Sequence, residues 1–255
     1  MRAVVVLPTF NECDNIEPFL RALREVTTAV DVLVVDDDSP DGTADRARAV
    51  GRQLGGVEVL VRPERNGLGS AYRDGFARVL DQRYEVVVSM DADLSHDPAE
   101  IPAMLRLISE GADVVIGSRY VIGGGTTDWP IHRQLLSRWG NAYTRIVLGL
   151  PTQDCTSGYR AYRASALRAI QPDTTGAEGY AFLTELVRRL ARQGVRIEET
   201  PIIFRDRTRG TSKMSWRIVI ESMLLVTRWG AGDLVDRFTL RRRVDSVRRY
   251  FRRAR

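Results

Sequence analysis

Cysteine is nearly absent from this sequence of 255 residues. Its two cysteines, Cys13 and Cys155, lie far apart, and neither belongs to a CxxC pair or to a cluster of cysteine and histidine. This usage argues against a disulfide framework and against a zinc site, and it is typical of a reducing compartment. We therefore expect a cytoplasmic protein.

Long uncharged stretches are also missing. A membrane-spanning helix needs about 20 mainly apolar residues, and the longest candidate, residues 216–229, contains Arg217, Glu221 and Arg228. The opening MRAVVVLP is too short for the apolar region of a signal peptide and predicts a first strand instead. We expect no spanning helix, no internal repeat and no low-complexity linker.

Lysine is almost absent, and positive charge is unevenly spread. Lys213 is the only lysine among 38 basic residues, and the formal net charge is +5. From Arg237 onward there are nine arginines against the single acid Asp245, so residues 1–236 are negative overall. An acidic body argues against a nucleic-acid groove. The basic tail, with apolar residues at helical spacing, predicts an amphipathic helix suited to anionic lipid, the alternative being a solvated arm.

Short β-rich runs alternate with helical patterns along the first half of the chain, which predicts an α/β fold with crossover helices and a mainly parallel sheet. The runs are Ala3–Leu7, Val32–Val35, Val57–Val61, Val86–Ser89 and Val114–Ile116. Later segments predict helices at about 131–148, 180–193 and 215–229, an irregular strand region at 154–162 and a strand pair at about 195–204. The apolar residues of 215–229 cover most of the helix, which suits either core packing or a membrane surface. We expect one domain over 1–230 and a tail over 231–255.

Two predicted strands end in carboxylates. The strand at 86–89 is followed by Asp91 and Asp93, and the strand at 31–35 by the acidic run 36–38. In an open α/β sheet ligands bind beyond the carboxyl ends of the strands, and carboxylate oxygens suit Mg²⁺ or Mn²⁺. Asp is also a common strand terminator and turn former, but two acidic ends together favour a metal site.

The ordered motifs resemble the family 2 inverting glycosyltransferases of the GT-A fold. They are PTFNE (8–12), VVDDDSPDGT (34–43), NGLG (66–69) and DADLSH (91–96). Three later motifs, GSRY (117–120), DCTSGYRAYR (154–163) and FRDRTRGTSK (204–213), are similar to the dolichol-phosphate mannose synthase group. The resemblance covers about residues 3–216 and implies a Rossmann-like GT-A domain with amphipathic C-terminal helices.

The resemblance implies a role for each matching residue. Those at the nucleotide are Pro8, Phe10, Glu12, Val35, Asp37 and Asp91. Those at the Mg²⁺ or Mn²⁺ are Asp91, Asp93 and, secondarily, Ser95, which stands where some members have Gln. Those at the phosphate of the acceptor are Arg119, Arg133 and Ser137. Arg207 and Lys213 belong to a cationic loop that closes over the phosphates, so the expected catalytic set is Asp91, Asp93, Arg119, Arg207 and Lys213. His96 is a weaker metal candidate, because these ions prefer oxygen.

The implied reaction moves mannose from GDP-mannose to a polyprenyl phosphate, with inversion. The phosphate nucleophile is already anionic, since the second pKa of a phosphate monoester is about 6, so no strong general base is needed. Loop 205–214 is the expected lid. Peripheral attachment to the cytoplasmic leaflet is expected, a separate membrane-anchor subunit being the alternative.

Three other functions fit part of the sequence. The first is a synthase that uses UDP-glucose, the second is a nucleotidyltransferase that releases pyrophosphate, and the third is a binding protein for anionic lipid or nucleic acid without catalysis. The acidic body argues against nucleic acid as a partner.

Overall fold

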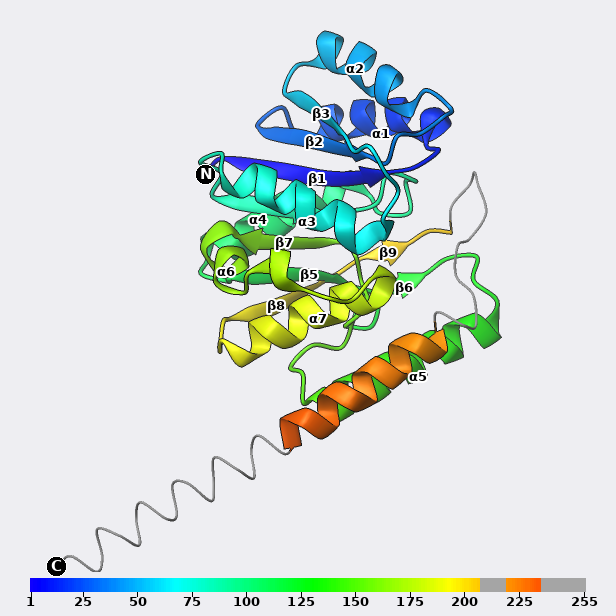
Figure 1. Ribbon diagram of the computed structural model, residues 1–255, viewed down its shortest axis with the longest axis vertical. Coiled ribbons are helices and arrows are strands. Elements are labelled where there is room, and N and C mark those ends of the chain that lie inside the picture. Colours follow the sequence, from blue (N-terminus) through cyan, green and yellow to red (C-terminus); the bar gives the residue numbers. More distant parts are fainter. Residues whose placement is uncertain (207–218, 235–255) are drawn as a thin grey trace, which may run out of the picture.

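The computed structural model describes residues 1–206 and 219–234 and contains a seven-stranded sheet with helices on both faces (Figure 1). The strand order is β3-β2-β1-β4-β7-β5-β8. The strands are β1 (Ala3–Thr9), β2 (Val30–Asp36), β3 (Val57–Val61), β4 (Val86–Ser89), β5 (Val114–Ser118), β7 (Arg160–Arg163) and β8 (Ile197–Pro201). Two short strands, β6 (Gly125–Thr126) and β9 (Ile203–Phe204), pair separately in parallel.

Both faces of the sheet are buried, as its nearly continuous Val and Leu runs require. In β1, Val5 and Leu7 face a core shared with α1 (Cys13–Val26), α2 (Thr43–Leu54) and α4 (Ile101–Ser109). Val4 and Val6 face the opposite core, which includes residues of α3 (Gly67–Leu80), α6 (Ala164–Ala169) and α7 (Gly179–Arg192). The expected α/β class, with a mixed, mainly parallel sheet flanked by helices, is confirmed.

The chain order reverses between β1 and β4, the position at which open α/β sheets bind ligands in a crevice. From β1 the chain moves outward through β2 to β3, and then crosses back to β4 on the other side of β1. Such a reversal leaves the carboxyl ends of the two central strands open to a ligand. The residues that follow β1 and β4 therefore lie where such a crevice is expected.

The second half of the sheet departs from the predicted pattern. Strand β7 runs antiparallel between β4 and β5. The two strands expected at about 195–204 are present as β8 and β9, but they do not pair with each other: β8 pairs with β5, and β9 pairs with β6. One 3₁₀ turn, Pro98–Glu100, precedes α4, and a second, Pro172–Thr174, precedes α7.

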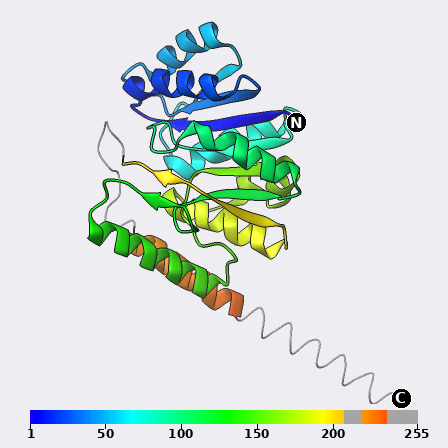
Figure 2. The same ribbon diagram turned by 180° about the vertical axis from the view of Figure 1, so that it is seen from behind.

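Helix α5 (Ile131–Leu148) has the bounds that the sequence predicts, and it lies beside the helical residues 219–234, apart from the sheet (Figures 1 and 2). The Tyr143 hydroxyl lies 2.7 Å from the Thr227 hydroxyl, and Gly230 lies against Val147. The expected domain boundary at 230 falls inside this second helix. Among the described residues, no helix is both long and apolar enough to cross a membrane.

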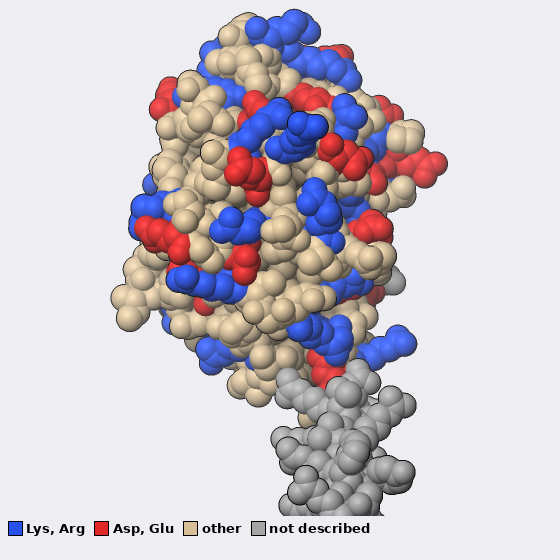
Figure 3. All heavy atoms as spheres, turned by 90° about the vertical axis from the view of Figure 1, so that its left-hand side faces the viewer, with Lys and Arg blue, Asp and Glu red and all other residues tan. Residues whose placement is uncertain are grey.

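The surface charge is mixed on the face that Figure 3 shows. Basic and acidic side chains alternate there without forming a broad basic track.

Candidate active site

The segment Asp91-Ala92-Asp93, a DxD sequence, forms a tight turn at the carboxyl end of β4. Asp93 is buried, whereas the Asp91 side chain is 39% exposed. The turn continues through Leu94, whose φ is +61°, and the backbone N–H of Ser95 donates to Asp93 Oδ1 at 3.1 Å. The carboxylate of Asp93 is thus fixed by the turn, whereas that of Asp91 is partly exposed to solvent.

His96 supports this turn through a hydrogen bond to its backbone. Its Nδ1 accepts a hydrogen bond from the backbone N–H of Asp91 at 3.2 Å, and its ring lies 5.1 Å from the Tyr159 ring and 5.4 Å from the Phe204 ring, between centroids. Burial lowers the pKa of His96 to about 4, although Asp93 acts in the opposite direction. The imidazole is therefore neutral near pH 7, and its Nδ1 lone pair is used within the protein. This arrangement fits a supporting residue better than a metal ligand.

The oxygen atoms around the DxD turn fit a hard divalent cation. Within residues 1–206 and 219–234, no three His, Cys, Asp or Glu side chains form a cluster that could hold a metal by themselves. Mg²⁺ is commonly held by one or two carboxylates together with substrate phosphates and water, which is what Asp91 and Asp93 offer. Ser95 Oγ is buried and has no hydrogen-bond partner in the described part of the chain. A hydroxyl oxygen two residues after Asp93 can bind a metal ion or one of the water molecules on that ion.

The acidic run after β2 is mostly engaged within the protein. Asp36 is fully buried and accepts from Thr9 Oγ1 at 2.7 Å and from the backbone N–H of Ser39 at 2.8 Å. Asp37 pairs with the buried Arg62. Burial raises the pKa of Asp37, and Arg62 acts against this rise. These carboxylates hold the loops that line the crevice.

The residues expected at the nucleotide lie around the ends of β1 and β2. The Arg65 guanidinium carbon lies 4.0 Å from the centre of the Phe10 ring, and Glu12 Oε2 accepts from Asn15 Nδ2 at 2.7 Å. Pro8 pairs in register with Val35. Val35 itself is fully buried in the core, so its side chain is not presented to the crevice.

Arg119 lies on the DxD side of the sheet, directly after β5, and is held by a buried carboxylate. Its Nε and Nη2 donate to the two oxygens of Asp154, each at 2.7 Å, and Nη2 also donates to Thr156 Oγ1 at 2.8 Å. Burial alone raises the pKa of Asp154, but the charge and hydrogen bonds of Arg119 outweigh it, so that this pKa lies below its ordinary value. The two groups form an internal ion pair that fixes the direction of the guanidinium.

Arg133 and Ser137, the other residues expected at the acceptor phosphate, lie on α5. Arg133 Nη1 donates to Asp206 Oδ2 at 2.9 Å, and its guanidinium stacks 4.0 Å from the centre of the Trp129 ring. Ser137 Oγ accepts from the Tyr120 hydroxyl at 2.6 Å. Arg207 and Lys213 lie outside the described residues.

Sequence reasoning gave no role to three residues of this region: Tyr120, Arg138 and Asp154. Tyr120 and Arg138 line a cavity together with Arg119. Asp154 opens the motif DCTSGYRAYR, so its position was visible in the sequence, but its partner lies 35 residues away. A buried ion pair of that separation has no local sequence signal.

Comparisons with known proteins agree with this architecture. Residues 4–171 match the family model described as glycosyl transferase family 2. An undecaprenyl-phosphate mannosyltransferase of Micrococcus luteus is 47% identical over 230 residues, which cover 90% of this chain and 94% of the relative. A polyprenol monophosphomannose synthase of Mycolicibacterium smegmatis is 40% identical over 237 residues, which cover 92% of this chain and 89% of the relative.

A similar fold occurs in a mannosyltransferase of Pyrobaculum calidifontis, solved in complex with GDP-Man and Mn²⁺. The TM-score is 0.61 at 20% identity, over 90% of this chain and 64% of that one. The chain therefore belongs to glycosyl transferase family 2 and, within it, to the group of polyprenyl-phosphate mannose synthases.

Proposed function

We propose that this protein transfers mannose from GDP-mannose to the monophosphate of a polyprenol, releasing GDP and inverting the anomeric centre. The observation that carries the proposal is the closeness of a carboxylate turn and a guanidinium group at one edge of the sheet. Phe204 joins them, since its ring lies 5.4 Å from that of His96 and 5.7 Å from the Arg119 guanidinium carbon. Such neighbouring regions suit a donor diphosphate with its cation on one side and an acceptor phosphate on the other. The names of the two relatives support the same reaction.

The residues of the donor side have distinct tasks in this proposal. Asp91 and Asp93, with Ser95 beside them, would hold Mg²⁺ or Mn²⁺, which stabilises the charge that develops on the departing GDP. Phe10, Glu12 and Asp37, with Pro8 and Val35 behind them, form the region assigned to the nucleotide. Both groups follow strands that end at the same edge of the sheet, which supports this assignment.

On the acceptor side the residues bind and orient the phosphate without removing a proton from it. A phosphate monoester is largely dianionic at neutral pH, so its oxygen attacks the anomeric carbon directly, from the face opposite GDP. Arg119, Arg133 and Ser137 would position it, and Arg207 and Lys213 would reduce repulsion between the phosphates. Positioning and charge compensation are then the main catalytic contributions.

The paired helices α5 and 219–234 are proposed to rest on the inner leaflet of the cytoplasmic membrane. Helix α5 exposes Ile131, Leu135 and Trp139 at successive four-residue intervals, and the second helix exposes Ile220 and Leu224. A stripe of this kind suits the boundary between headgroups and acyl chains. The nine arginines from 237 onward add attraction to anionic lipid. Attachment of this kind would bring the acceptor phosphate to Arg119 while its prenyl chain stays in the bilayer.

The decisive experiment compares radiolabelled GDP-mannose with radiolabelled UDP-glucose, each incubated with undecaprenyl phosphate and Mg²⁺ or Mn²⁺. The expected result is a mild-acid-labile lipid product from GDP-mannose, lost on addition of EDTA, with a β-linkage by NMR. Undecaprenol, which lacks the phosphate, is the matched control acceptor. Transfer only from UDP-glucose, or release of pyrophosphate in place of GDP, would contradict the proposal.

A further inference from the structure

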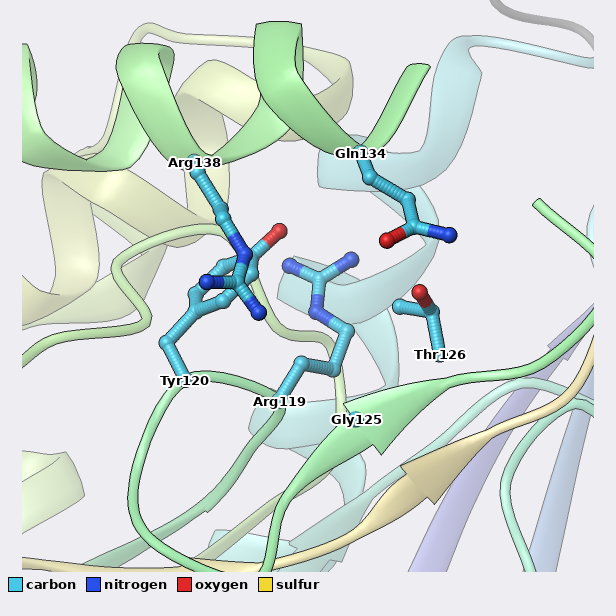
Figure 4. Close-up of a pocket in the computed structure, with 6 residues that line it drawn as sticks. All are labelled: Arg119, Tyr120, Gly125, Thr126, Gln134 and Arg138. Carbon is cyan, nitrogen blue, oxygen red and sulfur yellow. The ribbon is translucent and has the colours of Figure 1, made fainter. Parts of the chain in front are cut away.

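A small cavity lies between the loop after β5 and helix α5. Its volume is about 140 Å³, and its lining residues are Arg119, Tyr120, Gly125, Thr126, Gln134 and Arg138. Arg119 rises from the loop, whereas Gln134 and Arg138 descend from successive turns of α5, so that their polar ends converge (Figure 4). The face of α5 that meets Arg119 is thus the one carrying residues 134 and 138.

The two arginines of the cavity have different surroundings. Arg119 is neutralised and aimed by its bidentate bond to Asp154. Within residues 1–206 and 219–234, Arg138 forms no ion pair, and its guanidinium carbon lies 5.9 Å from the centre of the Tyr120 ring. By contrast Arg133, one turn earlier on α5, is paired with Asp206 and does not line the cavity. No carboxylate belongs to the described lining, so Arg138 supplies its uncompensated charge.

The size and charge of the cavity select a small anion. A cavity of about 150 Å³ admits a molecule the size of benzene, so this one, of about 140 Å³, has room for a phosphate group. Guanidinium groups bind phosphate through charge-assisted hydrogen bonds. Because Asp154 already compensates the charge of Arg119, the net positive charge at the cavity comes from Arg138, and an anion in the cavity would compensate it.

We propose that this cavity takes the phosphate of the lipid acceptor and that Arg138 binds that phosphate together with Arg119. The inference rests on the proposed function, because it assumes a phosphate monoester as the acceptor. It adds Arg138 to Arg119 as a direct ligand of the phosphate and places Gln134 and Thr126 at the rim of the cavity. Arg133 and Ser137 do not line the cavity, so they would act beside it, Ser137 through its hydrogen bond with Tyr120. The Tyr120 hydroxyl, which donates to Ser137 Oγ at 2.6 Å, forms one wall.

The test uses the full chain with Arg138→Gln, Arg138→Lys and the control Arg145→Gln. Arg145 is exposed on the same face of α5, about two turns later. Its replacement by Gln removes one positive charge, as Arg138→Gln does, but Arg145 does not line the cavity. The acceptor is farnesyl phosphate in solution, which separates phosphate recognition from attachment to a bilayer. Isothermal titration calorimetry measures binding of farnesyl phosphate and of GDP, and initial rates give KM and kcat.

The expected result is that Arg138→Gln raises KM and Kd for farnesyl phosphate by about 10- to 100-fold, the loss of one or two charge-assisted hydrogen bonds. Arg138→Lys should fall between this variant and wild type, since lysine keeps the charge but not the fork. Arg145→Gln should stay within about twofold of wild type, because Arg145 does not line the cavity. The Kd for GDP should be unchanged in all three variants.

Two outcomes separate this inference from the proposed function. If wild type is active and Arg138→Gln matches Arg145→Gln, or weakens GDP binding as much as acceptor binding, the cavity is not the acceptor subsite and the proposed function stands. If wild type neither binds farnesyl phosphate nor transfers mannose to it or to undecaprenyl phosphate, the proposed function fails and this inference fails with it.

Discussion

The buried ion pair between Arg119 and Asp154 gives a sharp prediction about stability. Asp154 is fully buried and Arg119 is 7% exposed, so Asp154→Asn leaves an uncompensated guanidinium inside the protein while keeping the shape of the side chain. Removing one partner of such a pair costs about 3–5 kcal/mol of unfolding free energy. With an m-value of about 3 kcal/mol/M, the urea midpoint should fall by roughly 1–1.7 M. Circular dichroism during urea titration at pH 7 measures this shift.

A matched control and a second mutation test the reasoning. Asp45, 87% exposed at its side chain, pairs with Arg48 on the surface. Its replacement by Asn should cost no more than about 0.5 kcal/mol. Adding Arg119→Met to Asp154→Asn should recover part of the loss, because both charges are then gone. Equal effects of Asp154→Asn and Asp45→Asn would refute the assignment of a buried, strongly coupled pair.

The same ion pair predicts a dependence on pH. The pKa of Asp154 is lower in the folded protein than in the unfolded chain, so its contribution is fully present above the unfolded value of about 3.9 and is lost as the pH falls below it. The stability difference between wild type and Asp154→Asn should therefore shrink below pH 4. A difference that stays constant from pH 7 to pH 3 would contradict this sign.

Three further predictions concern the metal, the membrane and the thiols. Asp93→Ala should abolish transfer while circular dichroism stays unchanged; near-normal turnover would remove Asp93 from the metal site. Leu135→Glu and, separately, deletion of residues 237–255 should each weaken cosedimentation with anionic vesicles without changing the Kd for GDP. If both variants bind the vesicles as well as wild type does, at low and at high salt, a separate anchor subunit becomes the better explanation. Burial raises the pKa of the Cys155 thiol to about 11. Native protein at pH 8 should therefore react with one equivalent of a thiol reagent, at Cys13, and unfolded protein with two equivalents. Rapid reaction of two equivalents in the native state would disprove the burial of Cys155.

Local sequence patterns determined much of the framework. The bounds of β3, β4 and α5 agree with those predicted, because continuous apolar runs and a repeat near 3.6 residues report directly on a strand or a helix. The DxD turn after β4 was also visible, since a strand followed by two acids ends at a known edge of a parallel sheet. The ordered motifs identified the family, which the comparisons confirm.

The tertiary structure decided which side chains are partners. Asp36, Asp37 and Asp91 all follow predicted strands, yet the first two are held by Thr9 and Arg62 whereas Asp91 is partly exposed at the crevice. Sequence periodicity describes one element at a time and carries no information about contacts between elements distant in the chain. The antiparallel insertion of β7 and the burial of Asp154 against Arg119 therefore depend on packing. The same holds for the face of α5 that meets the loop after β5, and hence for the place of Arg138 in the cavity beside Arg119.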